Sequence, residues 1–320
     1  MCPKRSSRRR FVRSVAATAS IALPYFVPRL SGWAGEPSRK LKLWMHWDME
    51  GASGLFHRDQ AWYKDKGVDP QVAEEGIQLL IADVNNGAKA ALKAGATELI
   101  ICDTHGGGGN FRPEQMFADP RITYLYRSRG YEGTSFRWMP GMNESVDGLM
   151  LMAHHAKAGT PGAFLPHTNS TNWADFLING QSVGEIGIEA CFAGHWDVPL
   201  ILVHGDEAAC KEAEEQFPGV VTANVKKAVS YDHCTGLDVT AAHQLTAEKI
   251  AEAIEKLKVS KPAPFKPSLP MRVTLRLTEE RFADPIAKRP GVRRIDACTV
   301  EAEVHRQCDV IKWIAGTGVD

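Results

Sequence analysis

Two carboxylates lie one residue apart where an apolar stretch near the start of the chain ends. Residues 40–47 are apolar enough to form a buried strand, and Asp48 and Glu50 follow it, with Gly51 and Gly54 behind them. In an extended backbone this spacing places both carboxylates on the same side. Two acids held together repel each other unless a cation or a proton lies between them. The stretch therefore favours a metal site, although an ordinary acidic turn would use the same residues.

Histidines follow two further apolar stretches in the same way. Residues 97–102 precede His105, and residues 148–153 precede the pair His154 and His155. Strands joined by helical crossovers are parallel, and their carboxyl ends meet at one edge of the sheet. We expect these histidines to converge there with the two carboxylates. Adjacent histidines project to opposite sides, so one of the pair should face the site and the other should pack behind it.

The order of apolar and polar stretches predicts an α/β fold, with a mostly parallel sheet flanked by helices. Residues 71–94 carry apolar side chains at helical spacing and connect the first two predicted strands. Further elements are expected as a short helix from Ser182, a strand over 198–203, helices over 206–217 and 241–257, and a strand near 220–229 between them.

The chain is predicted to have three parts. Residues 1–34 form a signal peptide, residues 35–260 form an α/β metal-binding catalytic domain, and residues 261–320 form a smaller α+β C-terminal unit. The third part begins with a proline-rich connector and contains a predicted antiparallel pair of strands, residues 271–277 and 298–304.

The first part resembles a twin-arginine export signal. Residues 1–34 contain seven Lys or Arg and no acid, and Arg8 and Arg9 precede a short apolar segment that ends in small residues. We expect cleavage after about Ala34, a periplasmic or secreted location, and no stable membrane insertion after cleavage. The remaining chain has 31 basic and 38 acidic residues, which gives no basic patch for nucleic acid.

Five motifs resemble, in order, those of the DppA-type zinc D-aminopeptidases, metallopeptidases that remove N-terminal D-amino acids from short peptides. The motifs are WDMEGASG, CDTHGGG, HHAKAGTPG, PHT and INGQSVGEIGIEA. The resemblance extends over most of the chain after the signal. It implies two Zn²⁺ ions per subunit, short peptides with N-terminal D-residues as substrates, and a homo-oligomer, which in this family is a decamer of two stacked five-membered rings.

The resemblance also assigns residues to the site. It implies that Asp48 bridges the two ions and that His167 is the active-site histidine, for which we expect proton transfer or stabilisation of charge on the carbonyl oxygen. Glu185 has a structural explanation as well, because it would complete a capping box with Ser182 at a helix start. The implied metal ligands are Asp48, Glu50, His105, His155 and Glu185.

Together, the residues and the resemblance predict a di-zinc metallo-aminopeptidase that hydrolyses N-terminal D-amino acids, such as D-Ala, from short peptides through a metal-bridging water. Two alternatives remain. A metal-dependent phosphoesterase would use the same oxygen and nitrogen ligands, with Arg112 and residues 126–129 as phosphate contacts. A non-catalytic exported peptide-binding protein would not need all five ligand types.

Overall fold

The computed structural model of the chain describes residues 40–126 and 139–315. The predicted signal peptide, residues 1–34, and the phosphate contacts proposed within residues 127–129 lie outside these ranges. Within the described ranges, no helix combines the length and the apolar character needed to cross a lipid bilayer.

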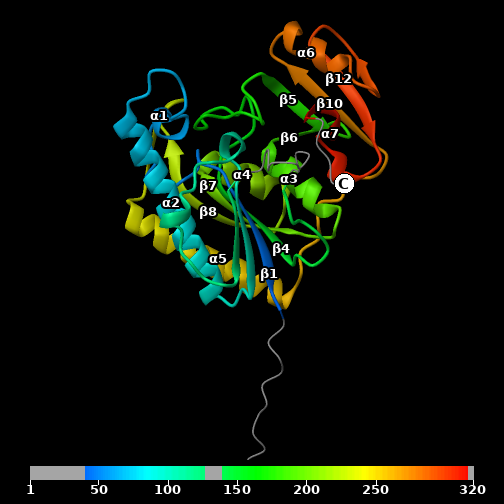
Figure 1. Cartoon of the computed structure of the whole chain (residues 1–320). Helices are drawn as coiled ribbons and strands as arrows, with labels where there is room; N and C mark the ends of the chain where they lie inside the picture. The colour runs from blue at the N-terminus through cyan, green and yellow to red at the C-terminus, as the bar shows by residue number, and fades with distance from the viewer. Residues whose placement is uncertain (1–39, 127–138, 316–320) are drawn as a thin grey trace, which may run out of the picture. The chain divides into compact units, whose positions relative to one another are not determined.

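A seven-stranded sheet carries the strand ends that the sequence singled out (Figure 1). Its order is β3-β2-β1-β4-β7-β8-β9, and all its neighbouring strands are parallel except the last pair. Buried strands of this kind have apolar residues on both faces, which explains why they are continuous apolar stretches in the sequence. The strands are β1 (Lys42–Trp47), β2 (Glu98–Asp103), β3 (Ile122–Leu125), β4 (Gly148–His154), β7 (Leu200–Asp206), β8 (Val221–Ala228) and β9 (Cys234–Gly236).

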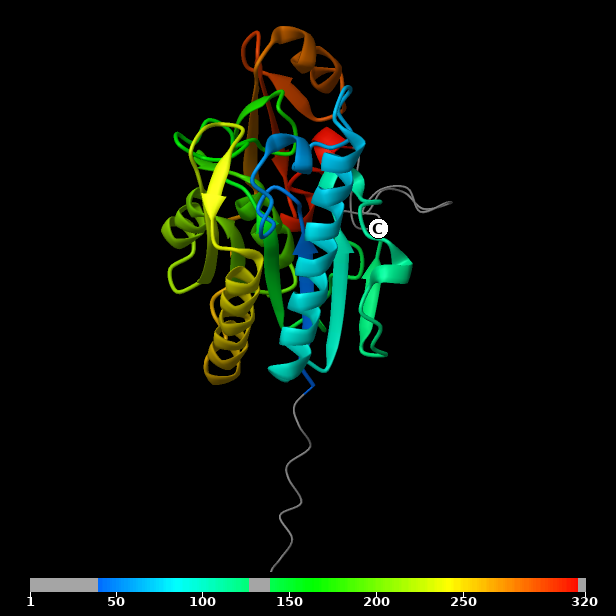
Figure 2. The same cartoon turned by 90° about the vertical axis from the view of Figure 1, so that its left-hand side faces the viewer.

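Helices cover both faces of this sheet, as the sequence predicted. On one face, α2 (Pro70–Lys93) and α5 (Val239–Val259) lie side by side (Figure 2) and pack on residues such as Met45 and Trp47. On the other face, α3 (Glu185–Gly194) and α4 (Glu207–Gln216) pack against Trp44 and its neighbours. The short helix α1 (Arg58–Ala61) contacts α2.

A second sheet of five antiparallel strands has the order β11-β12-β10-β5-β6. The predicted antiparallel pair corresponds to β10 and β12, so that prediction is confirmed. β5 and β6 precede residue 260 in the chain, so this sheet contains segments from both sides of the predicted domain boundary, and the boundary itself stays a prediction. The strands are β5 (Trp173–Ile178), β6 (Gln181–Val183), β10 (Met271–Leu277), β11 (Val292–Arg294) and β12 (Thr299–Val304).

Short elements complete the described chain. They are α6 (Glu280–Ala287), α7 (Lys312–Ala315) and the 3₁₀ turns η1 (His105–Gly107), η2 (Pro113–Gln115) and η3 (Gln307–Asp309).

The register of the parallel strands determines which loops meet. Trp47 at the end of β1 pairs with Asp103 on β2 and with Met152 on β4. The residues that follow these three strands therefore leave the sheet at the same edge. Polar side chains at three separated positions in the sequence are brought together in this way.

Candidate metal centre

The turn after β1 is held against the end of β4. The backbone N–H of Asp48 donates to the carbonyl of Met152 over 3.0 Å, and that of Gly51 donates to the carbonyl of Ala153 over 2.7 Å. A Cβ atom on Gly51 would lie 2.3 Å from the carbonyl oxygen of His154. Only glycine fits at this position, and the close approach places the carboxylates beside the histidines of β4.

A buried lysine fixes the other end of the same turn. Lys226 on β8 donates from Nζ to the carbonyl oxygens of Ala52 and Leu55, over 2.9 and 2.6 Å, and its ammonium lies over the ring of Phe164. Burial lowers the pKa of Lys226 to about 8. The turn that bears the two acids is thus anchored to β8 as well as to β4.

His105 begins the glycine-rich loop after β2, and its neighbour Asp103 shapes that loop. Asp103 is buried and accepts hydrogen bonds from the backbone N–H groups of Asn110 and Phe111, over 2.6 and 2.9 Å. The amide of Asn110 donates to the carbonyl of His105 over 2.8 Å. These contacts close the loop on itself and position the imidazole of His105 at the carboxyl edge of the sheet.

His155 comes two residues after a strained position at the end of β4. Ala153 has φ 57°, a backbone conformation that L-residues rarely adopt and that occurs often at functional sites. Nδ1 of His155 lies 3.0 Å from the carbonyl oxygen of Ala156, which fixes the ring and directs Nε2 into the site. His154 is fully buried on the other side, as expected for adjacent histidines.

Glu185 is the first residue of α3, and its N-cap is Gly184. The predicted capping box was therefore wrong, because Ser182 belongs to β6, where Phe176 pairs with Val183 and keeps this segment extended. Glu185 instead accepts a hydrogen bond on Oε1 from the backbone N–H of Asn169, over 2.6 Å.

The five predicted ligands meet in two groups that share Asp48. In the first group, Nδ1 of His105 lies 2.9 Å from Oδ1 of Asp48 and 3.2 Å from Oε2 of Glu50. In the second group, Nε2 of His155 lies 3.4 Å from Oδ2 of Asp48 and 3.3 Å from Oε1 of Glu185. The two oxygens of Asp48 thus face different histidines, as a bridging ligand requires.

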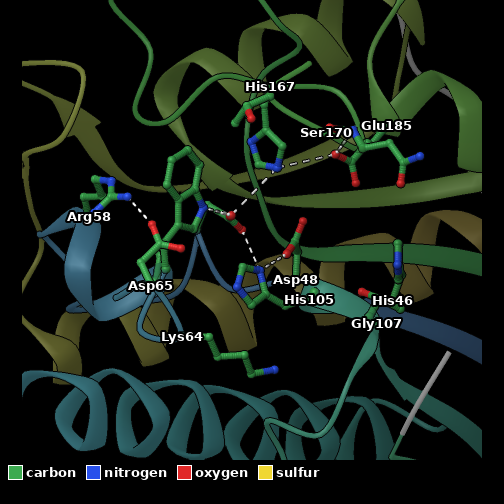
Figure 3. Close-up of a pocket in the computed structure, with 17 residues that line it drawn as sticks. His46, Asp48, Arg58, Lys64, Asp65, His105, Gly107, His167, Ser170 and Glu185 are labelled. Carbon is green, nitrogen blue, oxygen red and sulfur yellow. Dashed lines mark hydrogen bonds and ion pairs between the residues drawn. The ribbon is translucent and has the colours of Figure 1, made fainter. Parts of the chain in front are cut away.

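His167 lies between the two groups (Figure 3). Its Nε2 is 3.9 Å from Oε1 of Glu50 and 3.8 Å from Oε1 of Glu185. Its Nδ1 lies 2.9 Å from the carbonyl oxygen of Leu165, and its ring stacks on His155 with 3.9 Å between centroids. The structure therefore brings His167 to the same site, with one nitrogen held by the backbone and the other directed at the carboxylates.

The acids and imidazoles of the two groups perturb one another strongly. Burial raises the pKa of Glu50, but the charges of His105 and His155 outweigh it and hold that pKa well below its ordinary value. Burial lowers the pKa of both histidines, but the neighbouring acids raise it well above the ordinary value. These carboxylates require positive charge around them, which a divalent cation would supply in place of ring protons.

A cavity of about 530 Å³ opens onto this cluster. One wall comes from the segment after α1. Trp62 in this segment donates from Nε1 to Oε1 of Glu50 over 2.7 Å, and its ring meets that of His167 edge to face. Arg58 and Asp65 pair beside it (Figure 3). The sequence did not identify Trp62 as a site residue, because nothing in its spacing indicates a carboxylate partner.

Comparison with known proteins agrees with this geometry. The family model Peptidase M55, D-aminopeptidase, matches residues 41–315. A D-aminopeptidase of Bacillus subtilis (strain 168) is 32% identical over 222 residues, which are 69% of this chain and 77% of the relative. The solved structure of the Zn-dependent D-aminopeptidase DppA from Bacillus subtilis, a self-compartmentalizing protease, has a TM-score of 0.76 at 28% identity and is matched over 86% of this chain and 95% of that one.

The fold and the site thus define a metal-dependent peptide hydrolase. The chain belongs to the Peptidase M55 family of D-aminopeptidases, as its motifs predicted.

Proposed function

We propose that the protein is a di-zinc aminopeptidase that removes D-amino acids, such as D-Ala, from the N-terminus of short peptides. The observation that carries this proposal is the pair of buried three-residue groups that share Asp48. The relatives named above support the zinc ions and the D-residue. The cavity is within the size range of small-molecule sites, which suits a short peptide.

The residues present fit two zinc ions. Carboxylate oxygen and imidazole nitrogen are the donors that hydrolytic zinc sites use. Oε2 of Glu50 and Nε2 of His155 are buried and have no hydrogen-bond partner among the described residues, although both lie in ion pairs. In the proposed site, Glu50 and His105 would hold one ion, His155 and Glu185 would hold the other, and Asp48 would contribute to both. When bound, the ions lower the pKa of water and polarise the scissile carbonyl.

The remaining chemistry falls to His167. Its Nδ1–H donates to a backbone carbonyl, which leaves Nε2 as the nitrogen that faces the cavity. From this position it can transfer a proton to the departing amine or donate a hydrogen bond to the carbonyl oxygen as negative charge develops. Trp62 borders the same cavity and donates a hydrogen bond to Glu50.

A phosphoesterase is less well supported by the described residues. Arg112, the cation proposed as a phosphate contact, is paired with Glu74 through both of its terminal nitrogens. The cavity is lined by Arg58 and Lys64, and Arg58 is paired with Asp65. A phosphate clamp would require cations directed at the carboxylate cluster.

Metal analysis combined with hydrolysis of D-Ala and L-Ala p-nitroanilides tests the proposal. We expect at least two zinc ions per chain, two of them held by the five proposed ligands, and preferential release of D-Ala. Selective hydrolysis of p-nitrophenyl phosphate would favour the phosphoesterase, and peptide binding without hydrolysis would favour the non-catalytic binding protein.

We also propose a homo-oligomer and export through the twin-arginine route. The self-compartmentalizing relative supports the first and residues 1–34 support the second. Light scattering on the purified protein tests the assembly, since a monomer at all concentrations contradicts it. Fractionation tests export: the native chain should be processed near Ala34 and found outside the cytoplasm, and replacing Arg8 and Arg9 by Lys should retain it inside.

A further inference from the structure

A third cluster of metal-ligating side chains lies behind the two groups described above. It consists of His46 on β1, His154 at the end of β4 and Glu189 on α3. Their exposed fractions are 2%, 0% and 0%. None of the three has a role in the proposed reaction.

The ligand atoms of this cluster form a tight triangle. Oε2 of Glu189 lies 2.7 Å from Nδ1 of His46 and 3.3 Å from Nε2 of His154, and the two nitrogens are 3.3 Å apart. Ligand atoms about 2.0–2.1 Å from a tetrahedral zinc ion lie roughly 3.3 Å from one another. Two of the three distances match those of the His155 group. The third, between His46 and Glu189, is shorter and must lengthen when an ion enters.

Glu189 and His154 each have a buried polar atom without a hydrogen-bond partner among the described residues. These atoms are Oε1 of Glu189 and Nδ1 of His154. A buried carboxylate is costly unless a proton or a cation compensates it. The carboxylate is directed at two imidazole nitrogens, and two histidines with one glutamate are an established zinc donor set.

The cluster uses the same three elements as the group of Asp48, His155 and Glu185. His46 is two residues before Asp48 on the same side of the chain, His154 directly precedes His155, and Glu189 is one helical turn after Glu185. His46 also lines the cavity, where it lies near Asp48 in Figure 3. Of the three residues, His46 is the one that borders the cavity, so an ion would have to enter past its imidazole.

We propose that His46, His154 and Glu189 form a third divalent metal site, suited to zinc, beside the two groups that share Asp48. The alternative is a hydrogen-bonded network in which a proton replaces the ion. The proposal does not depend on the reaction assigned above, because it concerns different ligands.

Counting zinc in the full chain tests the site. The purified protein is saturated with zinc, freed of excess ion, and measured by native mass spectrometry and elemental analysis. We expect one zinc ion fewer in Glu189→Gln, which keeps the side-chain volume but removes the charge, than in the natural protein. With both ions of the proposed di-zinc site bound, the counts are two and three per chain. Glu212→Gln is the matched control, since Glu212 is a buried carboxylate outside all three clusters, and it should retain three.

Anomalous scattering from crystals of the zinc-saturated natural protein gives the location without relying on a variant that folds. A peak between His46, His154 and Glu189 supports the proposal, and its absence from a folded, saturated protein overturns it in favour of the network. The two peaks around Asp48 are read separately. Their absence would contradict the proposed di-zinc enzyme while the third position is still decided by its own peak.

Discussion

Nε1 of Trp62 donates a hydrogen bond to Oε1 of Glu50 over 2.7 Å, although the two residues come from different segments at the rim of the cavity. This contact orients a carboxylate that lies 3.2 Å, through its other oxygen, from His105. A hydrogen bond of this kind fixes the geometry of a ligand before the metal arrives.

Replacing Trp62 by Phe removes this N–H donor but keeps an aromatic ring against His167. We expect the affinity for zinc to fall about 10–100-fold, with the fold retained, because such supporting contacts have that effect on metal sites. Competition with a chromophoric chelator measures the change. Trp313→Phe is the control, since its indole N–H donates to the carbonyl oxygen of Val310 and Trp313 does not line the cavity. Equal affinities of Trp62→Phe and the natural protein would show that Glu50 needs no such support.

His167 has Nδ1 against the carbonyl oxygen of Leu165 and Nε2 directed at Glu50 and Glu185, and this position leads to a second prediction. His167→Ala should bind zinc as the natural protein does but should lose about 10²–10⁴-fold in kcat, the usual contribution of a positioned acid or base. Steady-state hydrolysis of a D-Ala anilide and zinc counting measure the two properties. His305→Ala, on an exposed residue, should change neither. If His167→Ala also loses an ion, then His167 is a ligand in the group it forms with Glu50 and His155.

The sequence predicts this site well where topology alone determines it. The carboxyl ends of parallel strands lie at the same edge of the sheet. An acid pair and histidines that follow three such strands must therefore lie close together at that edge. The sequence does not reveal contacts that depend on pairing between segments far apart in the chain. The sequence places the start of α3 at Ser182, which is wrong because β6 pairs with β5. It gives no indication of the partners of Glu189, because every residue of α3 is buried and the apolar spacing of the helix points to no particular neighbour.

The close approach of Gly51 to β4 gives a third prediction. In Gly51→Ala the new methyl would meet backbone atoms of His154, which cannot move without displacing the end of β4 and His155. We expect a loss of about 1–3 kcal/mol in the free energy of unfolding together with weaker zinc binding. Denaturant titration and chelator competition measure these two effects.

Gly219→Ala separates local strain from damage to the site. Gly219 has φ 90°, and a Cβ added there would meet no described atom within 4 Å, so the new methyl would strain the backbone without a steric clash. This variant should be destabilised with unchanged zinc affinity. If both variants bind zinc equally well, the contact of Gly51 with β4 is not what places His155.

Asp83 on α2 supports the turn after β1 that bears Asp48 and Glu50, and we expect this support to depend on pH. Asp83 is fully buried, accepts a hydrogen bond from the backbone N–H of Ser53 over 2.7 Å and lies 3.0 Å from Nε2 of His243. Burial raises the pKa of Asp83, but the contact with His243, the charge of His204 and the hydrogen bond from the Ser53 N–H outweigh it, so the pKa lies below the ordinary value of 3.8. A carboxyl group with a depressed pKa in the folded state stabilises the protein above its unfolded-state pKa.

Asp83→Asn should therefore cost about 1–3 kcal/mol of unfolding free energy near neutral pH, because a charged buried acceptor is lost. The difference from the natural protein should be complete well above pH 3.8 and should shrink as the pH falls through the lower folded-state pKa. Urea titrations of the metal-free protein, prepared with a chelator, measure this difference in unfolding free energy across the pH range. Asp284→Asn, on an exposed acid of α6, should show a small difference at every pH. A difference for Asp83→Asn that stays constant down to the lowest pH would mean that the charge of Asp83 contributes nothing and that its shape alone supports the turn.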